Sequence, residues 1–236
     1  MSTRLRYFLL FMIVMVATTA FGDPTIVNAN FGAVLIVCGN GYAYQGTDGC
    51  GAGPEQDFNS TPGFGWTLSN PTLGEGQSGL TGPGTSFQPP SFTGLPFTQA
   101  VFLQGGGAGG DGRNGFVSQE IGGFLAGNYT LSFYLGSRYS SGQYDGNQTV
   151  EALIDGNVFG TWALTSYTPF TLETAPFTID TDGTHTLEFM GINYGDHTAF
   201  LSGVSITPGG TTPEPSSLVL LATGLLGGFA KWYRRK

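Results

Sequence analysis

The chain has 236 residues, of which 14% are aromatic and only 10% charged, and its formal net charge is −8. Six of its eight basic residues lie within six positions of an end, so residues 23–212 hold fifteen acidic residues, two arginines and no lysine, a formal charge of −13. Such a surface repels polyphosphates, which argues against nucleic acid as a partner. The aromatic content argues against disorder in spite of the 40 glycines, because large apolar side chains supply the burial that a core needs.

The first 22 residues carry the features of a secretory signal peptide. Arg4 and Arg6 form a basic start, an apolar core follows at 7–16, and Ala-Phe-Gly at 20–22 offers small residues for cleavage. This order predicts that residues 1–22 direct the chain to the secretion machinery and are then removed. A buried N-terminal helix is the alternative.

Residues 23–207 are expected to form one all-β domain, a β-sandwich. Alternating apolar segments recur between turn signals, and none looks helical over more than one turn. The clearest strand covers residues 128–135, and one of its faces should line the core. The residues that share this face are Tyr129, Leu131, Phe133 and Leu135.

Two hairpins are expected in the second half of this domain. One turn is Asp155-Gly156-Asn157, because Asp and Gly accept the positive φ that tight turns require. The other is Asp182-Gly183, which should join a strand before it to a strand after it. The strands expected here cover residues 149–154, 158–164, 175–179, 184–190 and 198–206.

The first half of the domain is less regular. Residues 70–96 are rich in Gly, Pro, Ser and Thr and are expected to form a long loop. Trp66 and Trp162 lie in strand-like runs, which predicts core positions for both. Short strands are expected at 25–31, 33–37, 65–68 and 100–103.

Cys38 and Cys50 both follow the predicted signal peptide. In an oxidising compartment, a cysteine pair that closes a short loop is expected to form a disulfide, worth about 3 kcal/mol. A metal site would require further ligands nearby, and His185 and His197 are far along the chain, so no metal is expected. His185 shares its strand parity with apolar residues, which predicts a hydrogen-bonded core or rim position.

Two loops carry the chemistry that sugar binding requires. Aromatic faces stack against sugar C–H groups, and planar polar groups address paired hydroxyls. The loop 136–148 holds both kinds of side chain, and the loop 191–197 should approach it if the two lie at one end of the sandwich. A solvated pair of tyrosine-rich turns is the alternative. The candidate glycan-binding residues are Arg138, Tyr139, Tyr144, Asp145, Asn147, Tyr194, Asp196 and His197.

Several phrases of the domain resemble the galactose-binding-like jelly roll of carbohydrate-binding modules, and five of them follow in the family's order. The resemblance implies a jelly-roll sandwich and glycan binding without catalysis. Ser202 and Gly203 stand where such modules often carry acidic or amide side chains, so no cofactor is expected, and a structural calcium is the alternative. The phrases cover residues 28–31, 65–68, 117–121, 125–133 and 196–206.

The chain ends with an apolar run at 216–230 and a basic hexapeptide at 231–236, after a linker at 208–212. This pattern predicts a single transmembrane helix whose basic end stays cytoplasmic. With Pro213, Glu214 and Pro215 ahead of it, the segment 213–236 resembles the PEP-CTERM sorting signal of exported proteins from Gram-negative, exopolysaccharide-making bacteria. The resemblance implies transient membrane anchoring and processing by an exosortase-type membrane protease. An ordinary single-span anchor is the alternative.

These features together predict an exported protein without enzymatic activity. Its precursor is expected to be anchored in the inner membrane, and its mature form to act in the cell envelope or the exopolysaccharide matrix. Glycan binding is the expected function. A purely structural surface protein and a glycan-active enzyme are the alternatives, and no catalytic residues are expected, because neither histidine stands in a recognisable triad context.

Overall fold

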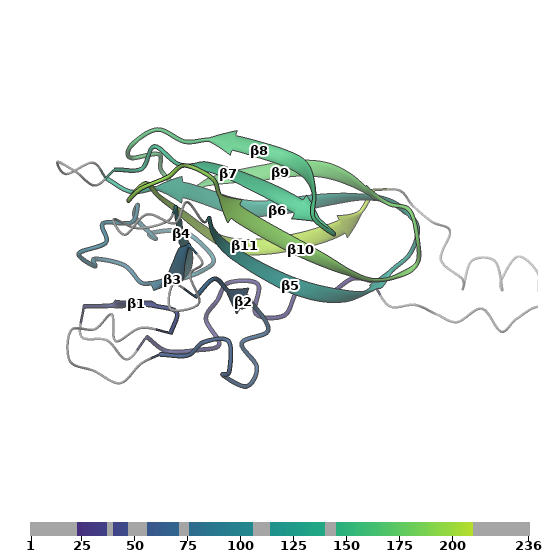
Figure 1. Cartoon of the computed structure of the whole chain (residues 1–236), viewed down its shortest axis with the longest axis horizontal. Helices are drawn as coiled ribbons and strands as arrows, with labels where there is room; N and C mark the ends of the chain where they lie inside the picture. The colour runs from purple at the N-terminus through teal and green to yellow at the C-terminus, as the bar shows by residue number, and fades with distance from the viewer. Residues whose placement is uncertain are drawn as a thin grey trace, which may run out of the picture. The chain divides into compact units, whose positions relative to one another are not determined.

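The computed structural model describes residues 23–36, 40–46, 56–70, 76–105, 114–139 and 145–209. Residues Asp23–Gly209 form one compact unit, which is built from two antiparallel β-sheets packed face to face (Figure 1). The described ranges contain no helix, and hence none that could cross a bilayer. The all-β prediction is confirmed, whereas the predicted signal peptide and transmembrane helix lie outside the described residues.

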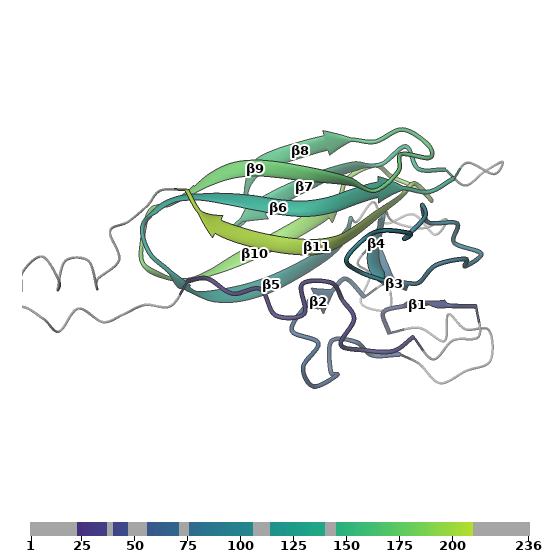
Figure 2. The same cartoon turned by 180° about the vertical axis from the view of Figure 1, so that it is seen from behind.

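The larger sheet has six strands in the order β1-β3-β4-β11-β6-β9, and the smaller has five in the order β2-β5-β10-β7-β8 (Figures 1 and 2). The strands of the larger sheet are β1 (Tyr42–Tyr44), β3 (Gln77–Thr81), β4 (Ala100–Gln104), β6 (Gly127–Ser137), β9 (Thr171–Ile179) and β11 (Thr198–Pro208). Those of the smaller sheet are β2 (Thr67–Leu68), β5 (Gly115–Phe124), β7 (Thr149–Ile154), β8 (Asn157–Ala163) and β10 (Gly183–Gly191).

The main core lies between the sheets and follows the predicted alternation. The predicted inward face of β6, from Tyr129 to Leu135, is buried and faces apolar residues of β5 and β10. Trp66 is buried, and the ring of Trp162 packs edge-on against Phe133 with centroids 4.9 Å apart. The core placement predicted for Trp66 is therefore confirmed, whereas Trp162 is half-buried at the edge of the core.

The two predicted hairpins have different outcomes. β7 and β8 pair around Asp155 and Gly156, whose φ angles of 50° and 77° are those of a tight turn, so the first hairpin is confirmed. The second is wrong, because β9 pairs with β6 whereas β10 pairs with β5 and β7. The connection at Asp182-Gly183 crosses from one sheet to the other. Inward alternation is the same in both arrangements, so it shows which face is buried but not which strand is the partner.

The N-terminal region also differs from expectation. The described residues 23–36 form turns rather than strands, and Asn28 and Phe31 have positive φ angles of 51° and 56°. The Asn28 side chain holds these turns, because its Nδ2 donates to the Phe64 carbonyl at 3.1 Å and its Oδ1 accepts from the Ala33 amide at 2.9 Å. Asparagine tolerates this conformation and replaces strand hydrogen bonds with its own.

The predicted long loop 70–96 is likewise interrupted, because it contains β3, and β1 was not expected. β3 is short and holds Gly79 at a point where an added Cβ would lie 2.1 Å from the Ala43 carbonyl oxygen. Only glycine allows β1 to approach so closely. A glycine that reads as a loop signal is therefore a strand residue here.

A second apolar cluster lies on the outer face of the six-stranded sheet. Phe87, Phe92 and Phe97 come from the segment 82–99 and pack on Phe102 of β4 and Phe200 of β11. We call these five side chains the outer aromatic cluster. Since the neighbouring residues of β4 and β11 face the main core, both strands are buried on both faces.

Candidate functional site

The candidate residues gather at one end of the sandwich. Ser137 at the end of β6 pairs with Ala199 at the start of β11, and Gly191 at the end of β10 pairs with Val150 near the start of β7. The segments that leave these strands therefore emerge together. We call this region, formed by residues 138–139, 145–148, 164–170 and 192–197, the loop end.

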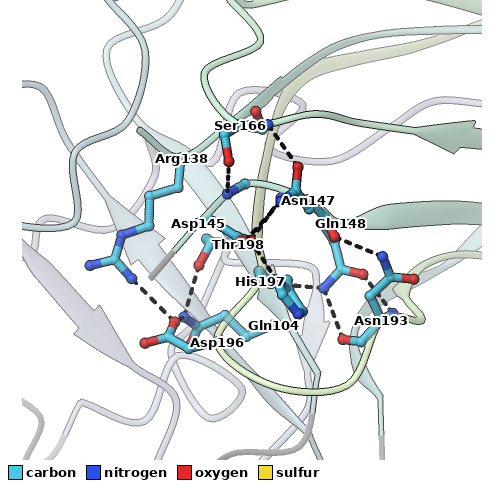
Figure 3. A network of polar contacts seen from close by, with 12 residues as sticks. Gln104, Arg138, Asp145, Asn147, Gln148, Ser166, Asn193, Asp196, His197 and Thr198 are labelled. Carbon is cyan, nitrogen blue, oxygen red and sulfur yellow. Dashed lines mark hydrogen bonds and ion pairs between the residues drawn. The ribbon is translucent and has the colours of Figure 1, made fainter. Parts of the chain in front are cut away.

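An ion pair joins the first of these segments to the last. Arg138 Nη1 lies 3.1 Å from Asp196 Oδ1 (Figure 3). The guanidinium carbon lies 4.6 Å from the centroid of the Phe87 ring. Arg138 is only 7% exposed. Arg138 therefore lies between Asp196 of the loop end and Phe87 of the outer aromatic cluster, where its cation faces an aromatic ring.

Gln104, the last residue of β4, supports this ion pair from below. Its Nε2 donates to Asp196 Oδ1 and also to Thr198 Oγ1, the latter at 2.8 Å, while its Oε1 accepts from the Tyr44 hydroxyl at 3.1 Å. Burial raises the pKa of Asp196, although the Arg138 charge works in the opposite direction. Burial also raises the pKa of Tyr44, and the charge of Asp196 adds to this effect.

A second pair joins Asp145 to His197. The carboxylate Oδ1 contacts Nδ1 of the imidazole, and the Thr198 amide donates to the Asp145 carbonyl at 2.9 Å (Figure 3). Asn147 donates to the same carboxylate through its backbone amide at 3.0 Å and its Nδ2 at 2.9 Å. Burial alone would raise the pKa of Asp145, but the hydrogen bonds from His197 and Asn147 outweigh it and lower that pKa.

Amide side chains fasten the two loops to each other. Buried Gln148 donates through Nε2 to the His197 carbonyl at 2.8 Å and accepts at Oε1 from the Asn193 amide at 2.7 Å. Asn193 Nδ2 in turn donates to the Asn147 carbonyl at 2.7 Å, and Asn147 Oδ1 accepts from the Ser166 amide at 3.0 Å. These hydrogen bonds therefore hold the described residues 147–148 in place against residues 193–197.

The loop end also carries exposed aromatic rings. Tyr139, Tyr167 and Tyr194 are 53%, 55% and 57% exposed, and every other aromatic side chain in the described residues is buried or half-buried. The rings of Tyr139 and Tyr167 lie edge to face with centroids 5.3 Å apart. Tyr167 has a positive φ of 60°, and its amide donates to the Arg138 carbonyl at 2.9 Å, so the backbone holds the two rings together.

The structure brings together seven of the eight candidate residues. Five belong to the polar network, and Tyr139 and Tyr194 are exposed next to it. Tyr144 lies outside the described residues, as do Cys38, Cys50, Pro213, Glu214 and Pro215. Sequence analysis did not identify Gln104, Ser166 or Tyr167. Only the register that places Gln104 opposite Thr198 reveals the first, and the turn before Pro169 was the one available signal for the others.

The described residues offer little to a metal ion or a catalytic triad. Among them, no group of three His, Cys, Asp or Glu side chains is placed to hold a metal. At the position that the sequence resemblance suggested for calcium, Ser202 donates to the Gln99 carbonyl at 2.8 Å and Gly203 packs against Tyr134. These groups do not fit a calcium ligand set. No serine or cysteine side chain in the described part of the chain is hydrogen-bonded to either histidine ring.

His185 occupies the rim position predicted for it. It is buried in β10, with Nδ1 2.6 Å from Asp155 Oδ2 and Nε2 2.8 Å from the Thr181 carbonyl oxygen. It belongs to the end of the sandwich opposite the loop end, because Gly183 at the start of β10 pairs with Phe124 at the end of β5.

Similar solved structures include the N-terminal modules of endo-1,4-beta-D-xylanase 10B from Clostridium thermocellum in complex with xylohexaose (TM-score 0.41, 16% identity), which this chain matches over 63% of its own length and 27% of that chain. A second is the K1 cleaved adhesin domain of Lys-gingipain from Porphyromonas gingivalis (TM-score 0.44, 14% identity), where the match covers 66% of this chain and 97% of that chain. A third is a family 35 carbohydrate binding module from Clostridium thermocellum (TM-score 0.38, 12% identity), where it covers 61% of this chain and 92% of that chain. The chain thus spans about a quarter of the xylanase chain but nearly all of the two single domains.

Comparison with curated proteins finds no matching sequence. A family model does match the C-terminal residues, and it confirms the resemblance predicted from the order of the proline–glutamate–proline triplet, the apolar run and the basic end. Residues 211–236 form a PEP-CTERM protein-sorting motif, which implies an exported, membrane-processed protein.

Proposed function

We propose that this protein is secreted by a Gram-negative bacterium, anchored briefly in its inner membrane, and processed by an exosortase-type protease. The mature β-sandwich then acts in the cell envelope or exopolysaccharide matrix, where it binds glycan at the loop end. The sorting motif at 211–236 supports the first part of this proposal. Mass spectrometry of the secreted form would test it, because residues 1–22 and those after Pro213-Glu214-Pro215 should be missing and Cys38 and Cys50 should be joined.

One observation carries the glycan-binding proposal: all the exposed aromatic rings of the described residues lie beside the same polar network. Tyrosine rings offer flat faces for sugar C–H groups, and the neighbouring carboxylates and amides can accept from and donate to hydroxyls. A ring kept in water costs free energy unless something covers it. The concentration of three such rings at one end indicates a surface that is covered by a partner.

The polar network would serve this binding by positioning. The Arg138–Asp196 pair is flanked by Tyr139 in one loop and Tyr194 in the other, so it fixes the distance between the two backbones. Binding to loops that are already ordered costs less conformational entropy than binding to mobile ones. Asn147, which is exposed, supplies the amide group nearest to the outer surface of the network.

A glycan array with the secreted protein and its variants tests the binding site. Tyr139→Ala and Tyr194→Ala should each weaken binding about tenfold, in line with the 1–1.5 kcal/mol that an exposed aromatic contact contributes. Tyr144→Ala and Asp145→Ala should weaken it as well. Leu172→Ala, at an equally exposed residue of β9, is the matched control and should leave binding unchanged. Unchanged binding in all four site variants would remove the site.

The satisfied state of the network favours a second candidate, a structural surface protein without a specific ligand. Both oxygens of Asp145, both ends of Gln148 and both ends of Asn147 already have partners inside the protein. If no glycan on the array binds while the fold is intact, this candidate replaces glycan binding. A glycan-active enzyme would be indicated by release of reducing sugar from the organism's own polysaccharide.

A further inference from the structure

The described surface of the domain presents no lysine or arginine to solvent. Residues 23–209 contain no lysine and two arginines, of which Arg113 lies outside the described residues. The other, Arg138, is 7% exposed. Over the described ranges, the domain therefore offers no exposed lysine or arginine for the charge-assisted contacts through which proteins usually hold carboxylate, sulfate or phosphate groups.

Arg138 does not supply that missing cation at the loop end. Its Nη1 donates to Asp196 Oδ1 (Figure 3). Its guanidinium lies over the ring of Phe87 in the outer aromatic cluster. An incoming anion would have to displace the Asp196 carboxylate and leave it buried without its counter-charge, which is strongly unfavourable. The fifteen acidic residues of the interval add a long-range repulsion of anionic polymers.

The carboxylates at the loop end are partly exposed although each contacts a basic side chain. The side chains of Asp145 and Asp196 keep 22% and 35% of their surface exposed, and the three exposed tyrosines stand beside them. A primary ammonium group gains from both features, because it donates charge-assisted hydrogen bonds to carboxylates and is attracted to the face of a tyrosine ring. A neutral hydroxyl gains only the weaker, uncharged hydrogen bonds.

Carboxylates alone do not single out this end. At the opposite end of the sandwich, Asp155, Asp180 and Asp182 are also exposed, but no exposed aromatic ring accompanies them in the described residues. The loop end differs because carboxylates and exposed rings occur together there. This combination is what an ammonium-bearing ligand requires, and such a ligand would join Arg138 and His197 as a further partner of the two partly exposed carboxylates.

We infer that the glycan bound at the loop end carries free primary amino groups, as in a de-N-acetylated hexosamine polymer, and not uronate or sulfate groups. This inference rests on the glycan-binding function proposed above and names the class of glycan. The ammonium groups would lie against the Asp145 and Asp196 carboxylates, while the sugar rings stack on Tyr139, Tyr167 and Tyr194.

The test compares glucosamine oligomers with N-acetylglucosamine oligomers of the same linkage and length, by titration calorimetry on the mature secreted protein. Acetylation removes the charge and keeps the sugar backbone, so the acetylated oligomer should bind at least tenfold more weakly at a pH below the amine pKa. Binding of the free-amine oligomer should weaken as the pH rises through that pKa and as salt is added. A polyuronate of similar length should not bind.

Charge-matched variants separate the site from the general field of the protein. Asp145→Asn, which keeps a hydrogen-bond acceptor for His197 and Asn147, and Tyr194→Ala should each weaken binding of the free-amine oligomer about tenfold. Asp180→Asn removes the same charge at the opposite end and should change binding less than twofold. Equal losses in Asp145→Asn and Asp180→Asn would overturn the inference. Because the Tyr194 side chain is exposed, Tyr194→Ala should fold normally and tests the site even if Asp145→Asn misfolds.

The outcomes also separate this inference from the proposed function. Equal affinity for the free-amine and acetylated oligomers, with loss in Tyr194→Ala, would leave glycan binding in place and overturn the amine preference. Tighter binding of the polyuronate would do the same. If no oligomer binds the folded protein, the inference fails, and the proposed function fails with it only if no glycan on the array binds either.

Discussion

The domain contains two histidine–aspartate pairs, one at each end of the sandwich. His185 contacts Asp155 at the turn between β7 and β8, and His197 contacts Asp145 at the loop end. In both pairs the carboxylate meets Nδ1 of the ring. The pairs differ in the other ring nitrogen, Nε2, and in how far water reaches the ring.

Nε2 of His185 faces the Thr181 carbonyl oxygen at 2.8 Å, and its side chain is 10% exposed. Both of its nitrogens therefore face acceptors, which only the protonated ring can satisfy. The hydrogen bond to Asp155 raises the pKa of His185, and the same bond lowers the pKa of Asp155 in spite of its partial burial. His197 is 34% exposed, and no described residue is hydrogen-bonded to its Nε2. The His185 ring is thus hydrogen-bonded at both nitrogens and shielded from water, whereas the His197 ring is partly exposed and contacts the protein through Nδ1.

The largest expected loss of stability comes from breaking the Arg138–Asp196 ion pair at the loop end. Asp196→Ala should lower the free energy of unfolding by about 3 kcal/mol, because it leaves the Arg138 guanidinium buried without its carboxylate. Urea denaturation measures this loss. Tyr194→Ala, two residues away and exposed, is the control and should cost less than about 0.5 kcal/mol. A small loss in Asp196→Ala would show that the ion pair does not hold the loops.

Breaking the His185–Asp155 pair at the opposite end should cause the next largest loss of stability, and this loss should depend on pH. His185→Gln should cost about 1.5 kcal/mol, because it removes a charge-assisted bond and one of two ring contacts. Since the folded pKa of His185 is raised, its stabilisation is full below about pH 6.5 and is lost as the pH rises through the folded pKa. Since the folded pKa of Asp155 is lowered, its stabilisation is present above about pH 4 and is lost as the pH falls through the folded pKa.

The stability difference between the wild type and His185→Gln should therefore be greatest between about pH 4 and pH 6.5. Thermal unfolding across the pH range measures it. A stability difference that grows above neutral pH would contradict a protonated His185 paired with Asp155.

His197→Gln should have a smaller effect on stability, about 0.5 kcal/mol, because both partners of this pair are partly exposed. The same thermal unfolding series measures it. Its effect should appear in glycan binding instead, since the substitution loosens the Asp145 carboxylate. A cost equal to that of His185→Gln would remove the distinction between the two ends.

The smallest expected change in stability belongs to Tyr139→Ala. The ring is half exposed and contacts Tyr167, so its removal should cost at most about 0.5 kcal/mol. Glycan binding should nevertheless fall about tenfold, as expected for an aromatic contact. If the loss in free energy of unfolding exceeds the loss in free energy of binding, Tyr139 is part of the fold and not of the ligand surface.

The sequence predicted which residues are buried better than it predicted which strands pair. The alternation of Tyr129, Leu131, Phe133 and Leu135 identified β6 and its inner face. The same alternation at Ala175 to Ile179 suggested a hairpin with the next strand, yet β9 joined β6 in the other sheet. Alternation reports a local property, whereas the choice of partner depends on the whole topology.

The site was predicted in part for the same reason. Two polar loops with tyrosines are visible in the sequence, and they meet through Asp145 and His197. Gln104 was missed because it ends an apolar strand and reaches the site only through its register with Thr198. The cover over the outer face was missed because Phe87, Phe92 and Phe97 lie in a segment whose glycines and prolines predicted only a loop.

The outer aromatic cluster has a consequence for how this domain opens in solution. β4 and β11 have aromatic or aliphatic side chains packed over both of their faces, so opening them would hydrate two apolar layers at once. Their amide hydrogens should be the last in the domain to exchange with deuterated solvent, through global unfolding alone. Because proteases cleave opened segments, strands that open only with the whole domain should also resist proteolysis.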